Sequence, residues 1–165
     1  MSAGQLGTHF GNAKIIMGMR RKGRELAVQG LYQLEMRGDP FLTLETFWKQ
    51  ADGSERAKDF GRGLVQGVTE FRDEINGLIS EAAQNWRIER LSAVDVCVLR
   101  VATYELLKRR EVPTSVILDE AIEIARRFST GESASFVNGV LDQIALKLGV
   151  KDNRGTTVES DSDDE

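Results

Sequence analysis

Apolar side chains recur along most of this chain at the three- and four-residue spacing of an amphipathic α-helix. The longest such pattern runs from Ser54 to Gln84, where the apolar positions form one continuous stripe. Each glycine in its first half lowers the stability of a helix by about 1 kcal/mol relative to alanine. The pattern therefore predicts a bend or break near Thr69 to Asp73. No segment alternates strictly between apolar and polar residues, as a half-buried strand does.

The same spacing predicts helices on both sides of this stripe. Gly38-Asp39-Pro40 ends the first of them, Ser92-Ala93-Val94-Asp95 has the form of a capping box that opens a later one, and Pro113 ends that later helix. The polar turn Ser129 to Ser133 separates the last two. The predicted ranges are about 20–37, 44–48, 92–112, 116–128 and 136–148. Six or seven helices with short links indicate an all-α fold of two packed helical bundles.

The two ends of the chain lack this pattern. Residues 1–18 contain four glycines and no periodic apolar set, which predicts a flexible extension. Residues 151–165 are acidic and have almost no apolar side chains to bury, which predicts a disordered tail. The sequence therefore divides into an N-terminal extension at 1–18, one helical domain at 19–150 and a tail at 151–165.

Charge is strongly segregated along the chain. The net charge is −4, but residues 152–165 hold six acidic residues and one arginine, a local sum of −5. Residues 14–37 hold six basic and two acidic residues, a local sum of +4. A tethered acidic tail could therefore compete weakly with RNA for the basic region, and a tail that only aids solubility is the alternative interpretation.

The chain offers no credible catalytic residues. His9, the single histidine, lies in the predicted extension, where no fixed nucleophile can use it as a base. Cys97, the single cysteine, lies on an apolar helix face and is expected in the core. Glu120 and Glu123 have helical spacing and are expected on a solvated helix face. We therefore expect neither an enzyme nor a bound metal or cofactor.

Two further patterns limit the class of protein. The glycines between 61 and 67 depart from the spacing of a dinucleotide-binding loop, so they are expected to allow close helix packing instead. The longest apolar runs are a few residues, far from the roughly 18 that a membrane span needs. A lone cysteine and the lack of a signal-like segment favour the cytoplasm.

The first predicted helix opens with a dense group of cations, namely Arg20, Arg21, Lys22 and Arg24. In the first turn of a helix, the dipole disfavours each of them by roughly 0.3 to 1 kcal/mol. A phosphate ligand would remove this conflict, and a tolerated, solvated basic turn is the alternative explanation. The cations at 108–110 and 126–127 lie at predicted helix C-termini, where the dipole favours them, so we interpret those as structural.

Aromatic residues lie near these features. The turn Ser129 to Ser133 exposes backbone N–H groups that could hold a phosphate, and Phe136 follows about one turn later. Phe136 is either a core residue or a platform on which an unpaired base stacks. Tyr32, on the first helix, has the same two interpretations.

Several stretches of the chain resemble the transcription antitermination factor NusB family over about residues 20–148. The first is RRKGRELAVQGLY at residues 20–32, similar to the arginine-rich opening helix of the family. The second is an ordered series formed by VLRVATYELL at 98–107, DEAIEIA at 119–125 and FVNGVLD at 136–142. So long a series in one order is very specific.

The resemblance implies a non-enzymatic, cytoplasmic, bacterial protein with two helical subdomains. It implies binding to the single-stranded boxA element of ribosomal RNA transcripts together with the small-subunit ribosomal protein NusE. With other Nus factors, the complex would help RNA polymerase to resist termination, and some family members also form homodimers. The residues that correspond to the RNA and partner surface are Arg20, Arg21, Lys22, Arg24, Tyr32, Asp95, Glu132 and Phe136.

The chain departs from the family at a few positions. Gly23 and Gly30 replace the usual alanines and are expected to weaken the first helix. Ala134 and Ser135 stand where a more polar or basic pair is common, which removes a phosphate contact. The alternative function is a helical protein-interaction module without direct RNA binding.

Overall fold

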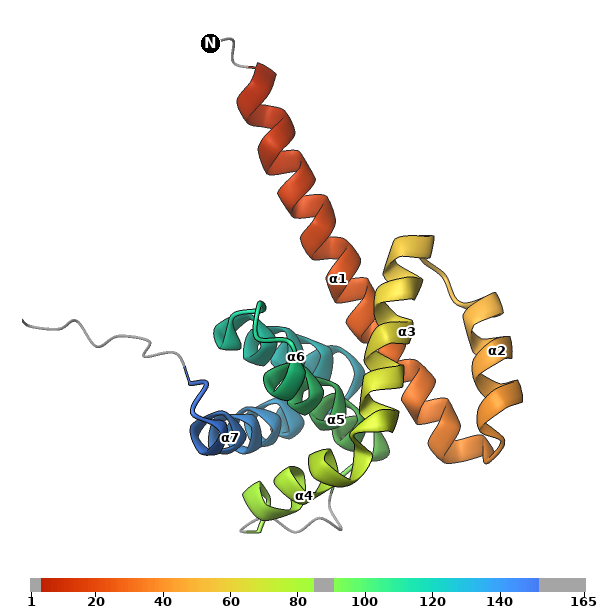
Figure 1. The fold of residues 1–165 in the computed structure, drawn as a ribbon, viewed down its shortest axis with the longest axis vertical. Helices are drawn as coiled ribbons and strands as arrows, with labels where there is room; N and C mark the ends of the chain where they lie inside the picture. Colours follow the sequence, from red (N-terminus) through yellow and green to blue (C-terminus); the bar gives the residue numbers. More distant parts are fainter. Residues whose placement is uncertain (1–3, 85–90, 152–165) are drawn as a thin grey trace, which may run out of the picture.

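The computed structural model describes residues 4–84 and 91–151, with side chains from residue 17 onward except at 40–42 (Figure 1). Over these residues the chain forms seven α-helices and no strand, which confirms the predicted all-α fold. The helices are α1 (Gly4–Arg37), α2 (Pro40–Gln50), α3 (Glu55–Glu70), α4 (Arg72–Ala82), α5 (Ala93–Lys108), α6 (Thr114–Phe128) and α7 (Gly131–Leu148). Residues 1–3 of the predicted extension and 152–165 of the predicted tail lie outside the described residues.

Capping residues place several helix ends where the sequence predicts them. Ser54 caps α3 and Ser92 caps α5, and each hydroxyl accepts a hydrogen bond of 3.1 Å from a backbone N–H in the first turn. Phe71 separates α3 from α4, which confirms the predicted break. Gly149 ends α7 in the left-handed region at φ +67°. None of the helices in the described part is both long and apolar enough to cross a membrane.

The first helix begins much earlier than predicted. Its glycines and missing apolar period predicted a start near Arg20, whereas α1 starts at Gly4, so this prediction is wrong. The cations at 20–24 consequently lie near the middle of α1, beyond the first turn in which the helix dipole acts. The helix dipole therefore gives no reason to expect an anionic ligand at these cations. Figure 1 shows the N-terminal part of α1 projecting beyond the other helices.

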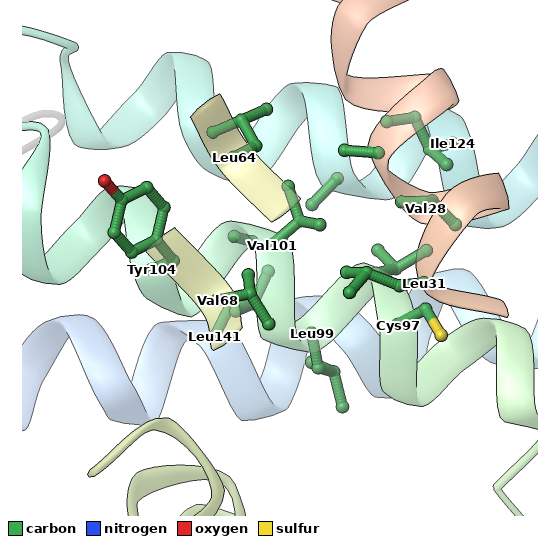
Figure 2. Packing of buried hydrophobic residues seen from close by; sticks show 14 of the residues in the cluster. Val28, Leu31, Leu64, Val68, Cys97, Leu99, Val101, Tyr104, Ile124 and Leu141 are labelled. Atoms are coloured by element: carbon green, nitrogen blue, oxygen red, sulfur yellow. The ribbon is translucent and has the colours of Figure 1, made fainter. Parts of the chain in front are cut away.

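Two helical bundles share one hydrophobic core. One bundle contains α1, α2 and α3, and the other contains α4, α5, α6 and α7. The central helix is α5, which packs against α1, α3, α4, α6 and α7 and is buried over most of its surface between Asp95 and Leu106. Figure 2 shows apolar side chains of α1, α3, α6 and α7 gathering around those of α5. Cys97 lies in this core, as predicted.

Glycines allow α1 and α3 to cross at very short distance. A Cβ atom on Gly23 would lie 2.6 Å from the Phe60 ring, and a Cβ on Gly61 would lie 2.8 Å from the Gly23 carbonyl oxygen. Both distances are too short for real side chains, so only glycine fits at the crossing. The sequence predicted that Gly23 weakens the first helix, but the residue also makes this close approach possible.

A third close approach joins α3 to α5. A Cβ on Gly67 would lie 2.1 Å from Cζ of Tyr104, so the tyrosine ring occupies the space that a side chain would need. Close packing at the glycines of α3 is thus confirmed at positions 61 and 67. At Gly63 the nearest atom belongs to the end of the flexible Arg109 side chain, 3.4 Å away. Position 63 therefore depends less on glycine.

Replacement of Gly67 by alanine tests this packing. We expect Gly67→Ala to lower the free energy of unfolding by about 1–3 kcal/mol, because the Tyr104 ring must move out of a filled core. The matched control is Gly77→Ala on α4, where no neighbouring atom lies within 4 Å. This second change should stabilise the protein by about 0.5–1 kcal/mol through helix propensity. Urea unfolding followed by circular dichroism measures both; equal effects would contradict the packing argument.

Deletion of residues 1–18 tests whether the N-terminal part of α1 belongs to the folded core. We expect little change in melting temperature, because Met17 is 62% exposed and the buried part of α1 begins at Gly23. Differential scanning calorimetry on the full and shortened chains measures the effect. A decrease of more than about 4 °C, which corresponds to roughly 1 kcal/mol in a domain of this size, would show that these residues stabilise the fold.

Candidate nucleic-acid interface

The cations of α1 are distributed over different sides of the helix. Arg20 is exposed, with its guanidinium 6.0 Å from the centre of the Phe60 ring, whereas the carbon chain of Lys22 lies beside Gly53. Residues two positions apart point in nearly opposite directions around a helix, so one ligand group cannot contact both. Neither has a carboxylate within ion-pair distance among the described residues, so both keep an uncompensated charge.

Arg21 pairs with a buried acid. Its Nε and NH2 groups donate to the two carboxylate oxygens of Glu120 on α6, at 2.9 and 2.8 Å. These hydrogen bonds and the charge of Glu120 raise the pKa of Arg21 above its usual value. Half of the Arg21 side chain is exposed, so its NH1 group remains available to a ligand. The prediction that Glu120 lies on a solvated face is wrong because this pairing buries it, whereas Glu123 is exposed as predicted.

Arg24 lies inside the protein. Its guanidinium donates to both carboxylate oxygens of Glu105 on α5, at 2.7 and 2.9 Å, and lies 5.4 Å from the centre of the Phe60 ring. The two side chains of the pair are 5% and 1% exposed. In this arrangement the Arg24 guanidinium joins α1 to α5 and presents no surface to a ligand, in contrast to the role implied by the family resemblance.

Arg127, which its place at a helix C-terminus led us to interpret as structural, is a surface cation paired with α1. It follows Arg126 at the end of α6, and its NH1 group donates to the buried carboxylate of Glu25 at 2.8 Å while two thirds of its side chain stay exposed. Because Glu25 lies one turn after Arg21 on α1, the guanidinium groups of Arg21 and Arg127 border the same side of that helix. Only the ion pairs that join α6 to α1 in the folded chain reveal this proximity.

Tyr32 lines a groove next to these cations. The groove has a volume of about 460 Å³, and Tyr32 and Phe128 are each more than a third exposed in it. Its lining residues are Val28, Gln29, Tyr32, Gln33, Met36, Arg37, Phe47, Val94 and Phe128. Aromatic faces with amide and guanidinium groups around them suit an unpaired base, which needs stacking and hydrogen bonds together.

A second hollow adjoins the groove on the side of Lys22. It has a volume of about 360 Å³ and shares Gln29, Gln33 and Phe47 with the groove that Tyr32 lines. We call the two hollows together the α1–α2 groove. Lys22 lies at one end of it and Tyr32 near the other, and ten residues of helix separate them by about 15 Å.

Asp95 lies beneath the turn between α6 and α7 and is 3% exposed. Its Oδ2 atom accepts a hydrogen bond of 2.8 Å from the Ser133 hydroxyl, and its Oδ1 atom has no partner in the described part of the chain. Asp95 therefore connects the N-terminus of α5 to that of α7 rather than completing the predicted capping box with Ser92. The neighbouring residue, Val94, lines the α1–α2 groove.

The two remaining predicted site residues have different surroundings. Glu132 is exposed in the first turn of α7, where a partner can reach it. Phe136 is 7% exposed and belongs to the core, which is the first of the two interpretations that its sequence position allowed. A base could stack on Phe136 only if the ring left the core.

Catalytic or metal-binding groups do not gather here. The described residues contain no group of three or more His, Cys, Asp or Glu side chains that could hold a metal ion. Burial raises the pKa of the Cys97 thiol to about 11, so it is a poor nucleophile at neutral pH. The arrangement of exposed guanidinium and ammonium groups around an aromatic groove is that of a helical binding protein.

Comparison with known proteins identifies the family. Residues 21–146 match the model of the NusB family, so the chain belongs to the NusB family. The transcription antitermination protein NusB of Syntrophotalea carbinolica is 44% identical over 144 residues, covering 78% of this chain and 92% of that protein. NusB of Myxococcus xanthus is 44% identical over 137 residues, covering 80% and 98%. Membership of this family makes the chain a transcription antitermination protein rather than an enzyme.

Solved structures agree with this assignment. NusB of T. maritima superposes with a TM-score of 0.68 at 41% identity and covers 78% of this chain and 91% of its own. A complex described as antitermination factors NusB and NusE with dsRNA gives a TM-score of 0.69 at 22% identity, covering 79% and 98%. At that identity the second likeness concerns the fold alone.

Substitution of Arg24 tests its structural role. We expect Arg24→Ala to lower the free energy of unfolding by about 3–5 kcal/mol, because the Glu105 carboxylate would remain buried without its partner. The matched control is Arg126→Ala, which removes an arginine from the exposed pair with Glu123 and should cost under about 1 kcal/mol. Urea unfolding of both variants measures the difference. Similar small losses would mean that the buried pair contributes little.

Proposed function

We propose that this protein binds single-stranded, boxA-type RNA of ribosomal RNA transcripts in the α1–α2 groove. It does so in the bacterial cytoplasm, together with the ribosomal protein NusE. The observation that carries the proposal is the pair of adjoining hollows, one lined by the cation Lys22 and the other by the exposed aromatic rings of Tyr32 and Phe128. A bound strand would place its phosphates along the cations and its bases in the groove.

Each part of the groove suits one part of the RNA. Lys22 attracts phosphate as an uncompensated charge, and Arg21 and Arg127 can each donate from N–H groups that their carboxylate partners leave free. Tyr32 offers a stacking face, a contact worth about 1–3 kcal/mol per base. Gln29 and other amide groups of the lining can hydrogen-bond to base edges and thereby select among sequences.

The comparisons support the proposed partners. The solved complex that superposes on this chain contains NusB, NusE and dsRNA, and a second neighbour is described as a plectonemic RNA supercoil. We extend these partners to the present chain, and with them other Nus factors and RNA polymerase in a complex that supports processive transcription. Glu132, exposed at the start of α7, is a candidate contact for the protein partner or the RNA. A homodimer that covers the groove would compete with RNA.

A second candidate function is a helical protein-interaction module without direct RNA binding. It is favoured by the ion pairs of Arg21 and Arg127, which reduce the positive charge beside the groove. The two functions differ in their dependence on salt. Binding to RNA through phosphates weakens steeply as salt rises, whereas apolar docking of a protein partner depends on salt much less.

The decisive experiment titrates boxA-type RNA at several salt concentrations, with and without NusE. We expect Lys22→Gln to reduce the slope of log K against log salt by about 0.7, the value for one phosphate on a single strand. Tyr32→Ala should weaken binding about 5- to 150-fold, which corresponds to 1–3 kcal/mol, and leave the slope unchanged.

Matched variants separate these effects from general ones. Lys147→Gln removes an exposed cation at the far end of α7 and should leave both affinity and slope unchanged. Tyr32→Phe keeps the stacking face and should bind nearly as tightly as the parent. If Lys22→Gln and Lys147→Gln had equal effects, or if RNA bound without a salt dependence, the proposed groove would be wrong.

A further inference from the structure

We propose that the acidic segment at residues 152–165 docks on a cationic pocket at the end of the C-terminal bundle. The pocket lies where the end of α5, the start of α6 and the residues after α7 meet, and it has a volume of about 290 Å³. It is separate from the α1–α2 groove, with which it shares no lining residue. The proposal does not depend on RNA binding.

The lining of the pocket contains more cations than acids. Arg109, Arg110 and Lys151 all line it, and the only acid in the lining is Glu105, whose charge Arg24 already neutralises. Arg110 has no carboxylate within ion-pair distance in the described part, and Arg109 has only the distant Glu111 at 3.9 Å. The pocket therefore offers guanidinium groups that lack a close carboxylate partner.

The start of α6 adds to this charge. No side chain caps the N-terminus of α6, which follows Pro113 directly. The first turn of an uncapped helix contributes a partial positive charge, and Thr114 in that turn lines the pocket. An anionic group held by Arg110 would thus also be favoured by the helix dipole.

The chain leaves α7 beside this pocket. Gly149, with φ +67°, turns the backbone out of α7, and the hydroxyl of Thr114 donates a hydrogen bond to the carbonyl of Val150. Lys151 lies in the pocket wall and pairs with Asp142 at 3.1 Å. The next residue in the sequence begins the acidic segment, so its point of attachment is set by contacts in the structure.

Charge and tethering favour this segment over a separate molecule. Residues 152–165 hold six acidic residues and one arginine, and five of the acids lie between Glu159 and Glu165. Eight to fourteen residues are enough for the chain to turn back on the pocket, and such tethering gives an effective concentration in the millimolar range. Screening over about 8 Å at physiological salt restricts the attraction to nearby cations, which disfavours more distant targets.

The experiment attaches a paramagnetic spin label to the full chain at Ser160→Cys. Cys97 need not be replaced, because it is buried and its pKa of about 11 leaves almost no thiolate to react. Amide signals of an isotopically labelled sample then report which residues the label approaches. We expect selective loss of signal intensity at 109–112, 114–117 and 149–151, and recovery of that intensity at high salt.

Variants connect this signal loss to the pocket. Arg109→Gln with Arg110→Gln should restore the intensities, whereas Arg56→Gln with Arg62→Gln, which removes the same charge from α3, should leave the loss in place. Three results would overturn the proposal: intensity loss centred on residues 19–24, loss spread evenly over the surface, or loss unaffected by the change at 109 and 110. The first would instead assign the acidic segment to the cations of α1.

Discussion

The buried ion pair between Arg24 and Glu105 is the contact on which the arrangement of the helices depends. Two charges removed from water stabilise a structure only when their hydrogen bonds are complete, and here both oxygens of Glu105 are paired. This requirement fixes the rotation of α1 about its own axis and its position along that axis relative to α5. It thereby decides which residues of α1 are buried and which face the groove and α6.

Glycine at three contacts allows the helices to approach closely enough for this pairing. Gly23 and Gly61 bring α1 and α3 together, and Gly67 receives the ring of Tyr104 from α5. The three helices α1, α3 and α5 thus form one tightly packed unit with the ion pair inside it. The remaining helices pack against this unit, and Arg127 of α6 reaches α1 through its hydrogen bond to Glu25.

Opposite charges organise the surface as well. Arg21 and Arg127 are each held by a carboxylate that is largely buried, so their positions are set while part of each guanidinium stays in solvent. Lys22 and Arg110, in contrast, have no close acid in the described residues. Both the α1–α2 groove and the pocket at the end of α5 therefore contain a cation without a close carboxylate, Lys22 in the first and Arg110 in the second.

The sequence by itself determined most of the helices and the family. Apolar spacing, serine caps and the order of motifs can be recognised along the chain without knowing which residues are in contact. It predicted the break at Phe71 and the core position of Cys97 correctly. It did not predict the start of α1 at Gly4, since the glycine-rich segment has no apolar period. Only the tertiary structure separated the buried Arg24 from the exposed Arg20. Both are arginines of the same helix, four residues apart, and their burial depends on which side chains of the other helices pack around each of them.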